Sequence, residues 1–402
     1  MSVTLPQSCV PATFNSLSLF GAEVTSLETS LVTNYNASVH LAYRFTQPSI
    51  QVQNATFCNV TVSYTHPGTD DNVNVEAWLP VGNWNGRFQA VGGGGWVAGR
   101  SAFVYTSMAG AIGDGYATIT TDAGLGSTME PSTWALLSPG NVNLHLLQDL
   151  GSTSLNDEAI IGKDLIKSFY GEGPSFSYWN GCSQGGRQGL MLAQRYPTAY
   201  DGIAAGAPAI NWTELFTSFF WPQQFMNMMG SYPYMCEMDE ITKAAITACD
   251  GLDGVVDGAI AAVDACLATF DPFQMVGETI NCSQADRELE ISSAAAAVVN
   301  ATWYGPESTE GKQLWYGLNP GSDLIHNGPA AAGQPGLVAT NCTSGVCAGA
   351  PNYLATSWIQ YFLAKDPEFD ISNITHAEFD RLAHISRQQY NSAIGTDDQA
   401  GK

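Results

Sequence analysis

The sequence has few charged residues and very few basic ones. Charged side chains make up 13% of the 402 residues, and the 14 lysines and arginines face 37 aspartates and glutamates, for a formal net charge of −23. Such a negative field repels phosphate backbones and anionic lipids, so we expect no nucleic-acid partner and no membrane partner. No stretch reaches the roughly 18 uninterrupted apolar residues of a membrane span. Hydrophobic residues still make up 45% of the chain, enough for a sizeable core.

Signals for targeting and for zinc are also missing. The first residues carry neither the basic segment nor the apolar segment of a secretory signal peptide, and we expect the numbering to start at a trimmed mature form. No Cys-x-x-Cys pair exists and no histidine lies at ligand spacing from a cysteine, so a structural zinc is not expected. Nine cysteines fit an oxidising compartment, and the odd number leaves one without an intrachain partner.

Acceptor motifs for N-glycosylation, by contrast, are numerous. Eight Asn-x-Ser/Thr motifs in a chain of this length favour a glycosylating secretory route. We therefore predict a secreted, extracellular protein with N-glycans, and the oligomeric state stays open. The eight asparagines are Asn36, Asn54, Asn59, Asn211, Asn281, Asn300, Asn341 and Asn373.

The chain divides by pattern into two parts. Residues 1–208 open with a β-rich layer and then alternate strands with helices, which predicts a parallel sheet with right-handed crossovers. The alternation disappears in residues 209–395, which we interpret as an inserted lid domain over the carboxyl edge of the sheet. Residues 396–402 are interpreted as a truncated return to the first domain. Expected strands cover 59–64, 73–78, 87–91, 116–121, 176–179 and 200–205, and expected helices cover 157–169 and 189–195.

A Gly-x-Ser-x-Gly pentapeptide surrounds Ser183, between the strand expected at 176–179 and a helix from Gly185 onward. In that context the pentapeptide forms a sharp turn that exposes the serine hydroxyl above the sheet. The N–H of Gln184 then lies at a helix N-terminus and can donate to an oxyanion. The alternative is a glycine-rich turn with an idle serine. We predict that Ser183 is a nucleophile.

A run of four glycines, residues 92–95, follows the strand expected at 87–91. Glycines let backbone N–H groups point inward where a side chain would clash, so we expect the second oxyanion donor here, with Gly94 as the central choice. A flexible surface loop is the alternative. A phosphate cradle is disfavoured because no lysine and serine or threonine follow in the required order.

Three aspartates recur in a glycine-turned loop at spacings of three and four: Asp250, Asp253 and Asp257. Carboxylates in such a loop can curl around one hard cation, and the carbonyls of Val255 and Ala259 could complete the shell. The flanking Cys249 and Cys266 suggest a stapled loop. We predict a structural calcium ion, with a solvated acidic turn as the alternative.

A serine nucleophile needs a general base, normally a histidine, which in this fold class follows an acid after the serine. Only His326, His376 and His384 follow Ser183. None of them ends a strand, and each is better explained as a lid surface or capping residue. We therefore expect the base to be absent from the sequence as given.

Several of these motifs together resemble the tannase and feruloyl esterase family. The resemblance rests on the run from Tyr178 to Gly189, on residues 201–208, and on the glycine run at 92–96. It also rests on the acidic run at 249–258, on residues 379–382, and on Gly395-Thr-Asp-Asp398. It implies an α/β-hydrolase fold with a large inserted lid domain, a calcium ion in the lid, a Ser-Asp-His triad and hydrolysis of aromatic esters.

The resemblance also carries an expectation about cysteines. It implies that the cysteine before the serine, here Cys182, pairs with a cysteine after the catalytic histidine. This sequence stops soon after Asp398, so we expect the C-terminal strands, the triad Asp and His and that cysteine to be missing, and Cys182 to be unpaired. The other eight cysteines could pair as Cys9–Cys58, Cys249–Cys266, Cys236–Cys282 and Cys342–Cys347, which the sequence alone does not prove.

The sequence thus predicts an ester hydrolase acting on small aromatic (phenolic) esters through a Ser183 acyl-enzyme. Its lid would hold the aromatic group on tryptophans and tyrosines of residues 212–235. Because the triad Asp and His are expected to be missing, we expect little or no turnover by this chain. Two alternatives stay open. One is an esterase that uses His384 oriented by Asp380, and the other is a catalytically inactive binding protein.

Overall fold

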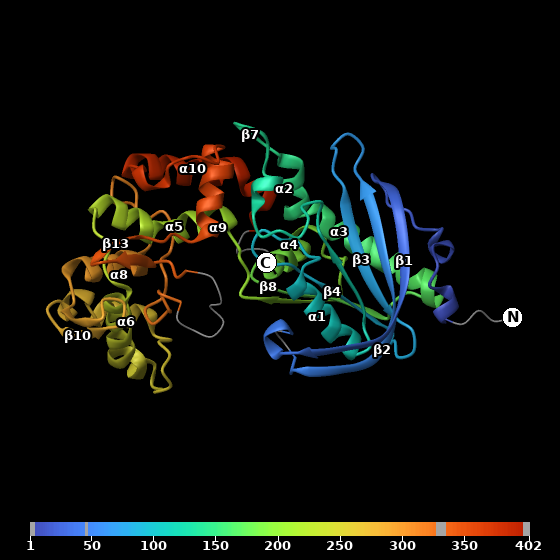
Figure 1. Ribbon diagram of the computed structural model, residues 1–402, viewed down its shortest axis with the longest axis horizontal. Helices are drawn as coiled ribbons and strands as arrows, with labels where there is room; N and C mark the ends of the chain where they lie inside the picture. The colour runs from blue at the N-terminus through green and yellow to red at the C-terminus, as the bar shows by residue number, and fades with distance from the viewer. Residues whose placement is uncertain (1–4, 45–46, 327–334, 397–402) are drawn as a thin grey trace. The chain divides into compact units, whose positions relative to one another are not determined.

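The computed structural model describes residues 5–44, 47–326 and 335–396, and the chain forms two compact units (Figure 1). Unit 1 comprises Met1–Trp212 and Tyr390–Lys402, and unit 2 comprises Thr213–Gln389. Unit 2 ends before the residue 395 expected for the lid, because the chain from Tyr390 onward belongs to unit 1. There the N–H of Asn211 donates to the carbonyl of Thr396 at 2.9 Å. Residues 397–402 of the expected return lie outside the described residues.

Unit 1 is built on a seven-stranded sheet with the order β1-β2-β3-β5-β4-β8-β9. The pairs from β1 to β5 are antiparallel, and those from β5 through β4 and β8 to β9 are parallel. The carboxyl ends of β5, β4, β8 and β9 therefore meet at one edge. The strands are β1 (Glu23–Val39), β2 (Ile50–Thr65), β3 (Val73–Pro80), β4 (Arg87–Val91), β5 (Ala117–Thr121), β8 (Phe176–Cys182) and β9 (Gly202–Gly206).

Helices cover both faces of this sheet (Figure 1). Successive residues of a strand point to opposite faces, and Ala90 and Val91 of β4 accordingly belong to two separate buried clusters. The cluster with Val91 includes side chains of α1, and the cluster with Ala90 includes side chains of α3 and α4. Unit 1 also contains a small hairpin. The helices are α1 (Ala102–Gly113), α2 (Leu144–Gly151), α3 (Thr153–Tyr170) and α4 (Gln184–Arg195), and the hairpin is β6 (Leu136–Ser138) with β7 (Asn141–Val142).

The described residues of unit 2 form two-stranded sheets only, which agrees with the loss of strand–helix alternation after residue 208. Its core gathers apolar side chains from α5, α6, α7 and α8, including Met226, Met238 and Val298. None of the described helices combines the length and apolarity needed to cross a membrane. The elements are α5 (Trp212–Met229), α6 (Met235–Cys249), α7 (Val263–Thr269), β10 (Thr279–Cys282), β11 (Arg287–Glu290), α8 (Ser293–Tyr304), β12 (Thr340–Thr343), β13 (Val346–Gly349), α9 (Tyr353–Ser357) and α10 (His376–Ile394).

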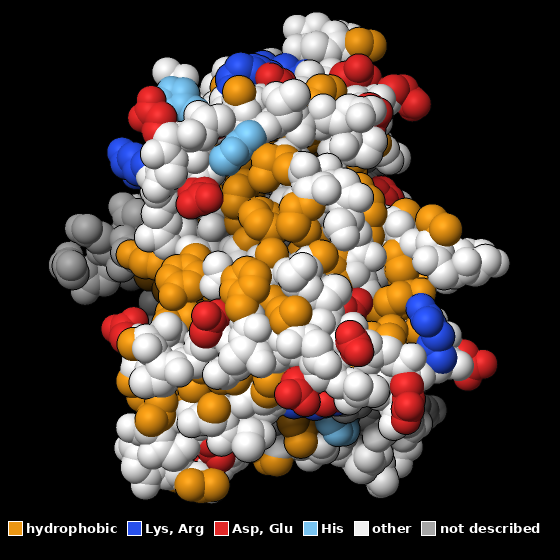
Figure 2. Space-filling view, turned by 90° about the vertical axis from the view of Figure 1, so that its left-hand side faces the viewer, with side chains coloured by type: hydrophobic (Ala, Val, Ile, Leu, Met, Phe, Trp, Pro, Cys, Tyr) orange, Lys and Arg blue, Asp and Glu red, His pale blue; other side chains and the backbone are white. Residues whose placement is uncertain are grey.

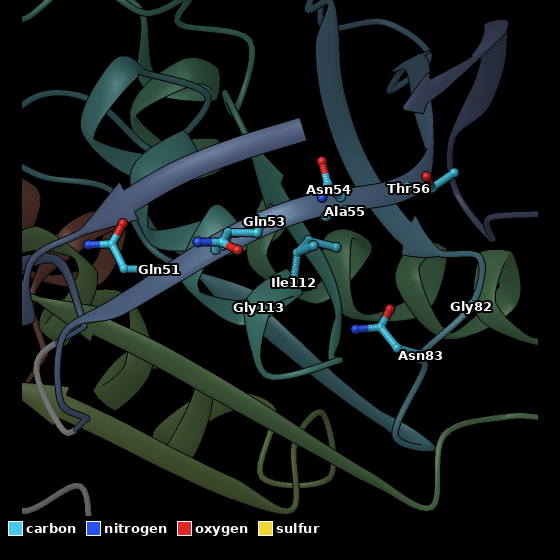
Figure 3. A pocket seen from close by; sticks show the side chains of 10 residues that line it. Gln51, Gln53, Asn54, Ala55, Thr56, Gly82, Asn83, Ile112 and Gly113 are labelled. Atoms are coloured by element: carbon cyan, nitrogen blue, oxygen red, sulfur yellow. The ribbon is translucent and has the colours of Figure 1, made fainter. Parts of the chain in front are cut away.

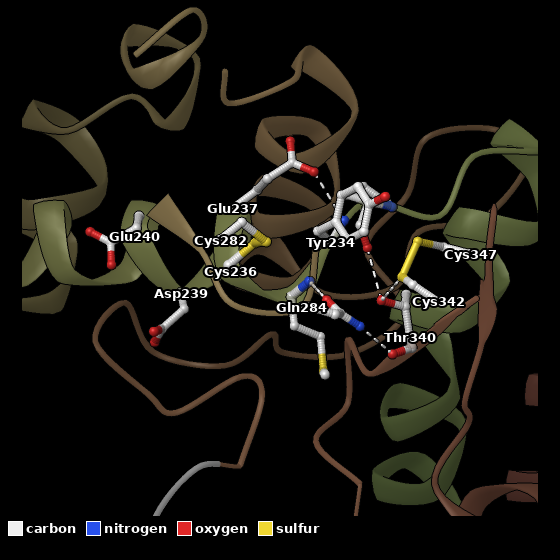
Figure 4. Close-up of a disulfide and its surroundings, with 12 residues drawn as sticks. Tyr234, Cys236, Glu237, Asp239, Glu240, Cys282, Gln284, Thr340, Cys342 and Cys347 are labelled. Atoms are coloured by element: carbon white, nitrogen blue, oxygen red, sulfur yellow. Dashed lines mark hydrogen bonds between the residues drawn. A yellow bond between two sulfur atoms is a disulfide. The ribbon is translucent and has the colours of Figure 1, made fainter. Parts of the chain in front are cut away.

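A disulfide and the side-chain amide of Gln284 connect α6, the β10–β11 hairpin and β12 (Figure 4). The Cys236–Cys282 bridge links α6 to β10. The amide of Gln284 accepts from the N–H of Met235 at 2.7 Å and donates to the carbonyl of Thr340 at 2.8 Å. The turn after β10 is thereby connected to the start of α6 and to β12.

Candidate active site

Ser183 lies in a tight turn between the end of β8 and the start of α4. Its backbone has φ 58° and ψ −117°, a conformation that L-residues rarely adopt and that costs on the order of 1–3 kcal/mol. Glycine is required beside it, because a Cβ on Gly181 would come within 2.5 Å of the backbone of Gly185. The strained turn points to a functional requirement at Ser183, since packing alone would not select it.

The backbone around Ser183 is anchored on both sides. Its N–H donates to the carbonyl of Gly206 in β9 at 3.0 Å, and its carbonyl accepts from the N–H groups of Arg187 and Ala209 at 2.9 and 3.0 Å. The side chain of Ser183 is exposed. The turn therefore presents the hydroxyl to solvent at the carboxyl edge of the parallel strands, as the pentapeptide predicts.

The glycine run packs directly on the turn. The N–H of Gly185 donates to the carbonyl of Gly93 at 3.0 Å, and the N–H of Gly93 donates to the side chain of Gln188 at 2.9 Å. A Cβ on Gly92 would come within 2.7 Å of the Cα of Gly185. The run is therefore a fixed loop beside Ser183, and not a flexible surface loop.

The N–H of Gly94, however, is already hydrogen-bonded in this arrangement. Its N–H donates to the carbonyl of Val97 at 3.1 Å, and the N–H of Val97 donates back to Gly94 at 3.1 Å. The loop closes on itself there, and the choice of Gly94 stays a prediction that this bond does not favour. The N–H of Gln184 is the first of α4, so it has no acceptor within the helix, and it stays a candidate donor.

Arg187 of α4 is fully buried and was not expected from the sequence to have a role. Its guanidinium donates to the side chain of Gln184 at 2.7 Å and to the carbonyls of Leu150 and Gly151 at 2.8 and 2.9 Å. It also lies over the ring of Trp212, 5.7 Å from the centroid. Burial lowers the pKa of Arg187 to about 9, which leaves it charged at neutral pH. Arg187 therefore connects the turn at Ser183 to the end of α2 through hydrogen bonds.

None of the histidines that follow Ser183 lies in unit 1. His326, His376 and His384 all belong to unit 2. The Nε2 of His376 donates to the carbonyl of Glu307 at 2.8 Å, a contact within unit 2. None of the hydrogen bonds of the described residues joins a histidine to the Ser183 hydroxyl, and the absence of the base stays a prediction.

The pairing of His384 with Asp380 is not found. Although the two residues are four apart on α10, the carboxylate of Asp380 accepts from the backbone N–H and the hydroxyl of Thr309, both at 3.1 Å. His384 is exposed. One oxygen of the Asp380 carboxylate is therefore already used by Thr309, and His384 as an alternative base stays a prediction.

Known proteins share the sequence pattern of this chain. Residues 58–399 match the family model described as tannase and feruloyl esterase. The chain belongs to the tannase and feruloyl esterase family. It is 41% identical over 354 residues to a probable feruloyl esterase of Arthroderma benhamiae, covering 87% of this chain and 62% of that protein. It is 33% identical over 234 residues to a tannase of Aspergillus oryzae, covering 56% of this chain and 38% of that protein.

Solved structures of the family show the same fold. Tannin acyl hydrolase of Aspergillus niger superposes with a TM-score of 0.80 at 26% identity, over 98% of this chain and 71% of that one. Feruloyl esterase B of Aspergillus oryzae gives a TM-score of 0.71 at 25% identity, over 96% of this chain and 70% of that one. The fold is therefore the α/β-hydrolase fold. This chain spans between 56% and 62% of the length of three of its feruloyl esterase relatives.

The disulfides agree with the pairing proposed from the sequence. The structure contains Cys9–Cys58 in unit 1 and three bridges in unit 2, namely Cys236–Cys282, Cys249–Cys266 and Cys342–Cys347. Cys182 is free and half-buried, directly before the nucleophile turn. Both expectations, the four pairs and the unpaired Cys182, are confirmed.

We predict that the unreduced chain carries one thiol, at Cys182. Burial raises the pKa of the Cys182 thiol, which lowers the thiolate fraction and slows its reaction in the folded state. Titration with Ellman's reagent should give one thiol per chain in guanidinium chloride and a much slower reaction without it. A Cys182→Ala variant should give none, and a thiol that persists in this variant would contradict the pairing.

The acidic loop of this family member is ordered by its own carboxylates. Asp250 accepts from the N–H groups of Asp257 and Gly258 at 3.1 and 2.9 Å, and Asp253 accepts from the N–H groups of Val255 and Ala261 at 2.9 and 3.2 Å. The loop is exposed. The oxygens of the three carboxylates do not all lie within 4.8 Å of one another. Among the described residues, one group of possible ligands is that close, and it lies elsewhere in the chain.

Two of the four rings expected to stack on an aromatic ligand are buried. Trp212 and Trp221 are 1% and 2% exposed. Trp212 packs against Trp96 with ring centroids 5.2 Å apart, and the indole N–H of Trp221 donates to the carbonyl of Ala301 at 3.2 Å. The expectation of a stacking surface is wrong for these two tryptophans, because both belong to the packed interior.

Two pockets are lined by residues other than those of the turn at Ser183. One, of about 500 Å³, is formed by β2 and the end of α1, and its polar lining consists of amides and a threonine hydroxyl: Gln51, Gln53, Asn54, Asn83 and Thr56 (Figure 3). It holds no titratable side chain and therefore no acid–base chemistry. The other, of about 800 Å³, lies in unit 2 and includes Phe225, Phe273 and Tyr304. Figure 2 shows hydrophobic side chains gathered on the face that it views.

Proposed function

We propose that this chain is a serine hydrolase acting on carboxylic esters of aromatic (phenolic) acids, of the feruloyl esterase or tannase type. The observation that carries the proposal is the strained, glycine-packed turn that exposes Ser183 between β8 and α4. Membership of the tannase and feruloyl esterase family supports the same reaction class. The printed names of the relatives give both substrate types, so the choice between ferulate and gallate is left to experiment.

In the proposed mechanism, the Ser183 hydroxyl attacks the ester carbonyl and an acyl-enzyme forms with loss of the alcohol. The N–H of Gln184 donates to the oxyanion of the tetrahedral intermediate, an interaction that strengthens as negative charge develops. Water then releases the acid. We further propose that this chain turns over slowly by itself, because no histidine among the described residues is hydrogen-bonded to Ser183.

The division into two units supports a second part of the proposal. We assign unit 2 the role of a lid that sets substrate choice, with Tyr232 and Tyr234 as half-exposed rings available for contact with an aromatic group. The four disulfides are consistent with secretion. Five of the eight sequon asparagines are exposed and could carry glycans: Asn36, Asn54, Asn281, Asn341 and Asn373.

The experiment that tests the proposal measures hydrolysis of methyl ferulate and methyl gallate by the full chain, with and without added imidazole. An external base can replace a missing histidine, so the Ser183-dependent rate is expected to rise with imidazole concentration. A chain that hydrolyses both esters at an ordinary enzyme rate, roughly 1–10³ per second, without imidazole would contradict the missing base. Hydrolysis that does not depend on Ser183 would contradict the function itself.

We also propose that the acidic loop binds a structural calcium ion. Its donors are all oxygens, and no described hydrogen bond uses the carbonyls of Val255 and Ala259. Asp250, Asp253 and Asp257 would supply the carboxylates. The donor chemistry fits calcium, and the Cys249–Cys266 bridge holds the two ends of the loop together. A bound ion would stabilise unit 2 and take no part in the ester chemistry.

Calcium is therefore expected to raise the thermal stability of the chain. At a free concentration 100 times the dissociation constant, binding to the folded state alone adds about 2.7 kcal/mol. Melting curves in calcium and in EGTA should differ for the native sequence and coincide for Asp253→Asn. Glu288→Gln removes an exposed carboxylate from β11 and should keep the difference. An equal calcium response in Asp253→Asn would contradict this site.

A further inference from the structure

A buried cluster of one histidine and three aspartates lies in unit 1, on elements other than β8 and α4. His66 and Asp71 come from the β2–β3 connection, Asp149 from α2 and Asp157 from α3. The Nδ1 of His66 lies 2.5 Å from Asp71, and its Nε2 lies 3.1 Å from Asp157. The three aspartates are only 5–7% exposed. Three acids and one imidazole are therefore gathered where water has little access.

Asp149 interacts with the side chain of Asp71, but its hydrogen bonding is incomplete. Its Oδ2 atom is buried and has no hydrogen-bond partner. One nitrogen of His66, one oxygen of Asp71 and one oxygen of Asp149 nevertheless lie within 4.8 Å of one another, so Asp149 is directed into the cluster. No lysine or arginine of the described chain forms an ion pair with these aspartates. A buried carboxylate without a partner is unfavourable unless a proton or a cation accompanies it.

We propose that His66, Asp71 and Asp149 form a binding site for a divalent transition-metal ion, with zinc as the preferred ion. An imidazole nitrogen with two carboxylate oxygens is a ligand set that zinc accepts, with bonds of about 2.0–2.2 Å. Tetrahedral bonds of this length separate ligand atoms by roughly 3.4 Å. Binding would therefore widen the contact between His66 and Asp71 and draw Asp149 inward.

The surroundings of the three ligands would hold them in this orientation. The hydroxyl of Thr65 donates to the other oxygen of Asp71 at 2.8 Å, and Asp157 contacts the second nitrogen of His66. The hydroxyl of Tyr64 donates to that same oxygen of Asp157 at 3.1 Å. Such contacts fix the ring of a ligating histidine and raise its basicity.

A cation here would also remove an electrostatic cost. Burial, together with the neighbouring acids, raises the pKa of Asp149 to about 7, so its carboxyl holds a proton through much of the acidic range. Zinc would displace that proton and the one between His66 and Asp71, and both protons would be released to solvent. The metal would join the β2–β3 connection to α2, whose last carbonyls accept from Arg187. This inference does not depend on the esterase proposal.

The test is direct metal binding by the full chain, purified without a histidine tag. Zinc titration followed by metal analysis of the dialysed protein should give one tightly held equivalent, with a raised melting temperature. Cobalt(II) bound in place of zinc should give the visible absorption bands of a site with four or five ligands. Asp149→Asn should weaken zinc binding by more than roughly tenfold. Asp70→Asn, an exposed neighbour of Asp71, should bind as the native sequence does.

The outcomes separate a metal site from a purely hydrogen-bonded cluster. If the native chain retains no zinc, or if Asp149→Asn retains as much zinc as the native chain, the proposal is overturned. His66→Gln provides a second variant if Asp149→Asn does not fold. Calcium should not displace zinc from the site, since an imidazole ligand suits zinc and not calcium. Equal displacement of the zinc by calcium would also overturn it.

Discussion

Replacing Ser183 by alanine is expected to abolish the imidazole-dependent part of ester hydrolysis, because the residues of a catalytic triad act as a unit and an added base has no effect without the nucleophile. The substitution removes the oxygen that forms the acyl-enzyme in the proposed mechanism. The hydrolysis rates of methyl ferulate and methyl gallate are measured for the native chain and for Ser183→Ala at the same imidazole concentration. A fluorophosphonate reagent should add mass to the native chain and none to Ser183→Ala.

The matched control is Ser175→Ala, which removes an exposed hydroxyl just before β8. Its rate should equal that of the native chain. Ser183→Ala should keep the native melting temperature within a few degrees, because the side chain is exposed and the backbone bonds do not involve it. If Ser183→Ala kept the native rate, the nucleophile would have to be another residue and the mechanism would fail.

Replacing Arg187 by methionine is expected to destabilise the chain by about 3–5 kcal/mol, because hydrogen bonds to a charged donor are each worth about 1.5–3 kcal/mol. Methionine fills similar space but donates nothing, so the side chain of Gln184 and the carbonyls of Leu150 and Gly151 lose their donor. These groups are in the interior, where water cannot replace the guanidinium. Urea unfolding monitored by tryptophan fluorescence measures the change.

Arg381→Met supplies the comparison at an exposed site. Arg381 pairs with Glu378 on the surface of α10, and its side chain is 54% exposed, so its loss should change stability by at most about 1 kcal/mol. Arg187→Lys should lie between the two, since a single ammonium cannot reach three acceptors arranged for a planar fork. A loss for Arg187→Met no larger than that for Arg381→Met would show that the buried contacts contribute little.

Local sequence predicted most of the elements that position the turn. The strand expected at 87–91 is β4 with the same bounds, and the strand expected at 176–179 is the first part of β8. The helix expected at 157–169 begins earlier, at Thr153, because its first turn continues from the end of α2 with little apolar periodicity to reveal it. Hydrophobic periodicity and the placement of glycines determine local structure over a few residues, so both can be recognised in the sequence.

Long-range contacts account for what the sequence missed. Arg187 appeared as one basic residue on a helix, and only packing between α2 and α4 shows that it is fully enclosed. The cluster of His66 with Asp149 joins residues more than eighty positions apart in the sequence.

The sequence by itself predicted the turn at Ser183 and led to the proposed reaction class, because the turn is encoded in five consecutive residues and the surrounding motifs resemble one family. It also led to the cysteine pairing and to the unpaired Cys182. The tertiary structure alone decided which backbone N–H groups are already bonded, which tryptophans are buried and which acids meet around His66. Those properties depend on distances between segments that are remote in the chain, and the strand order of the sheet sets those distances.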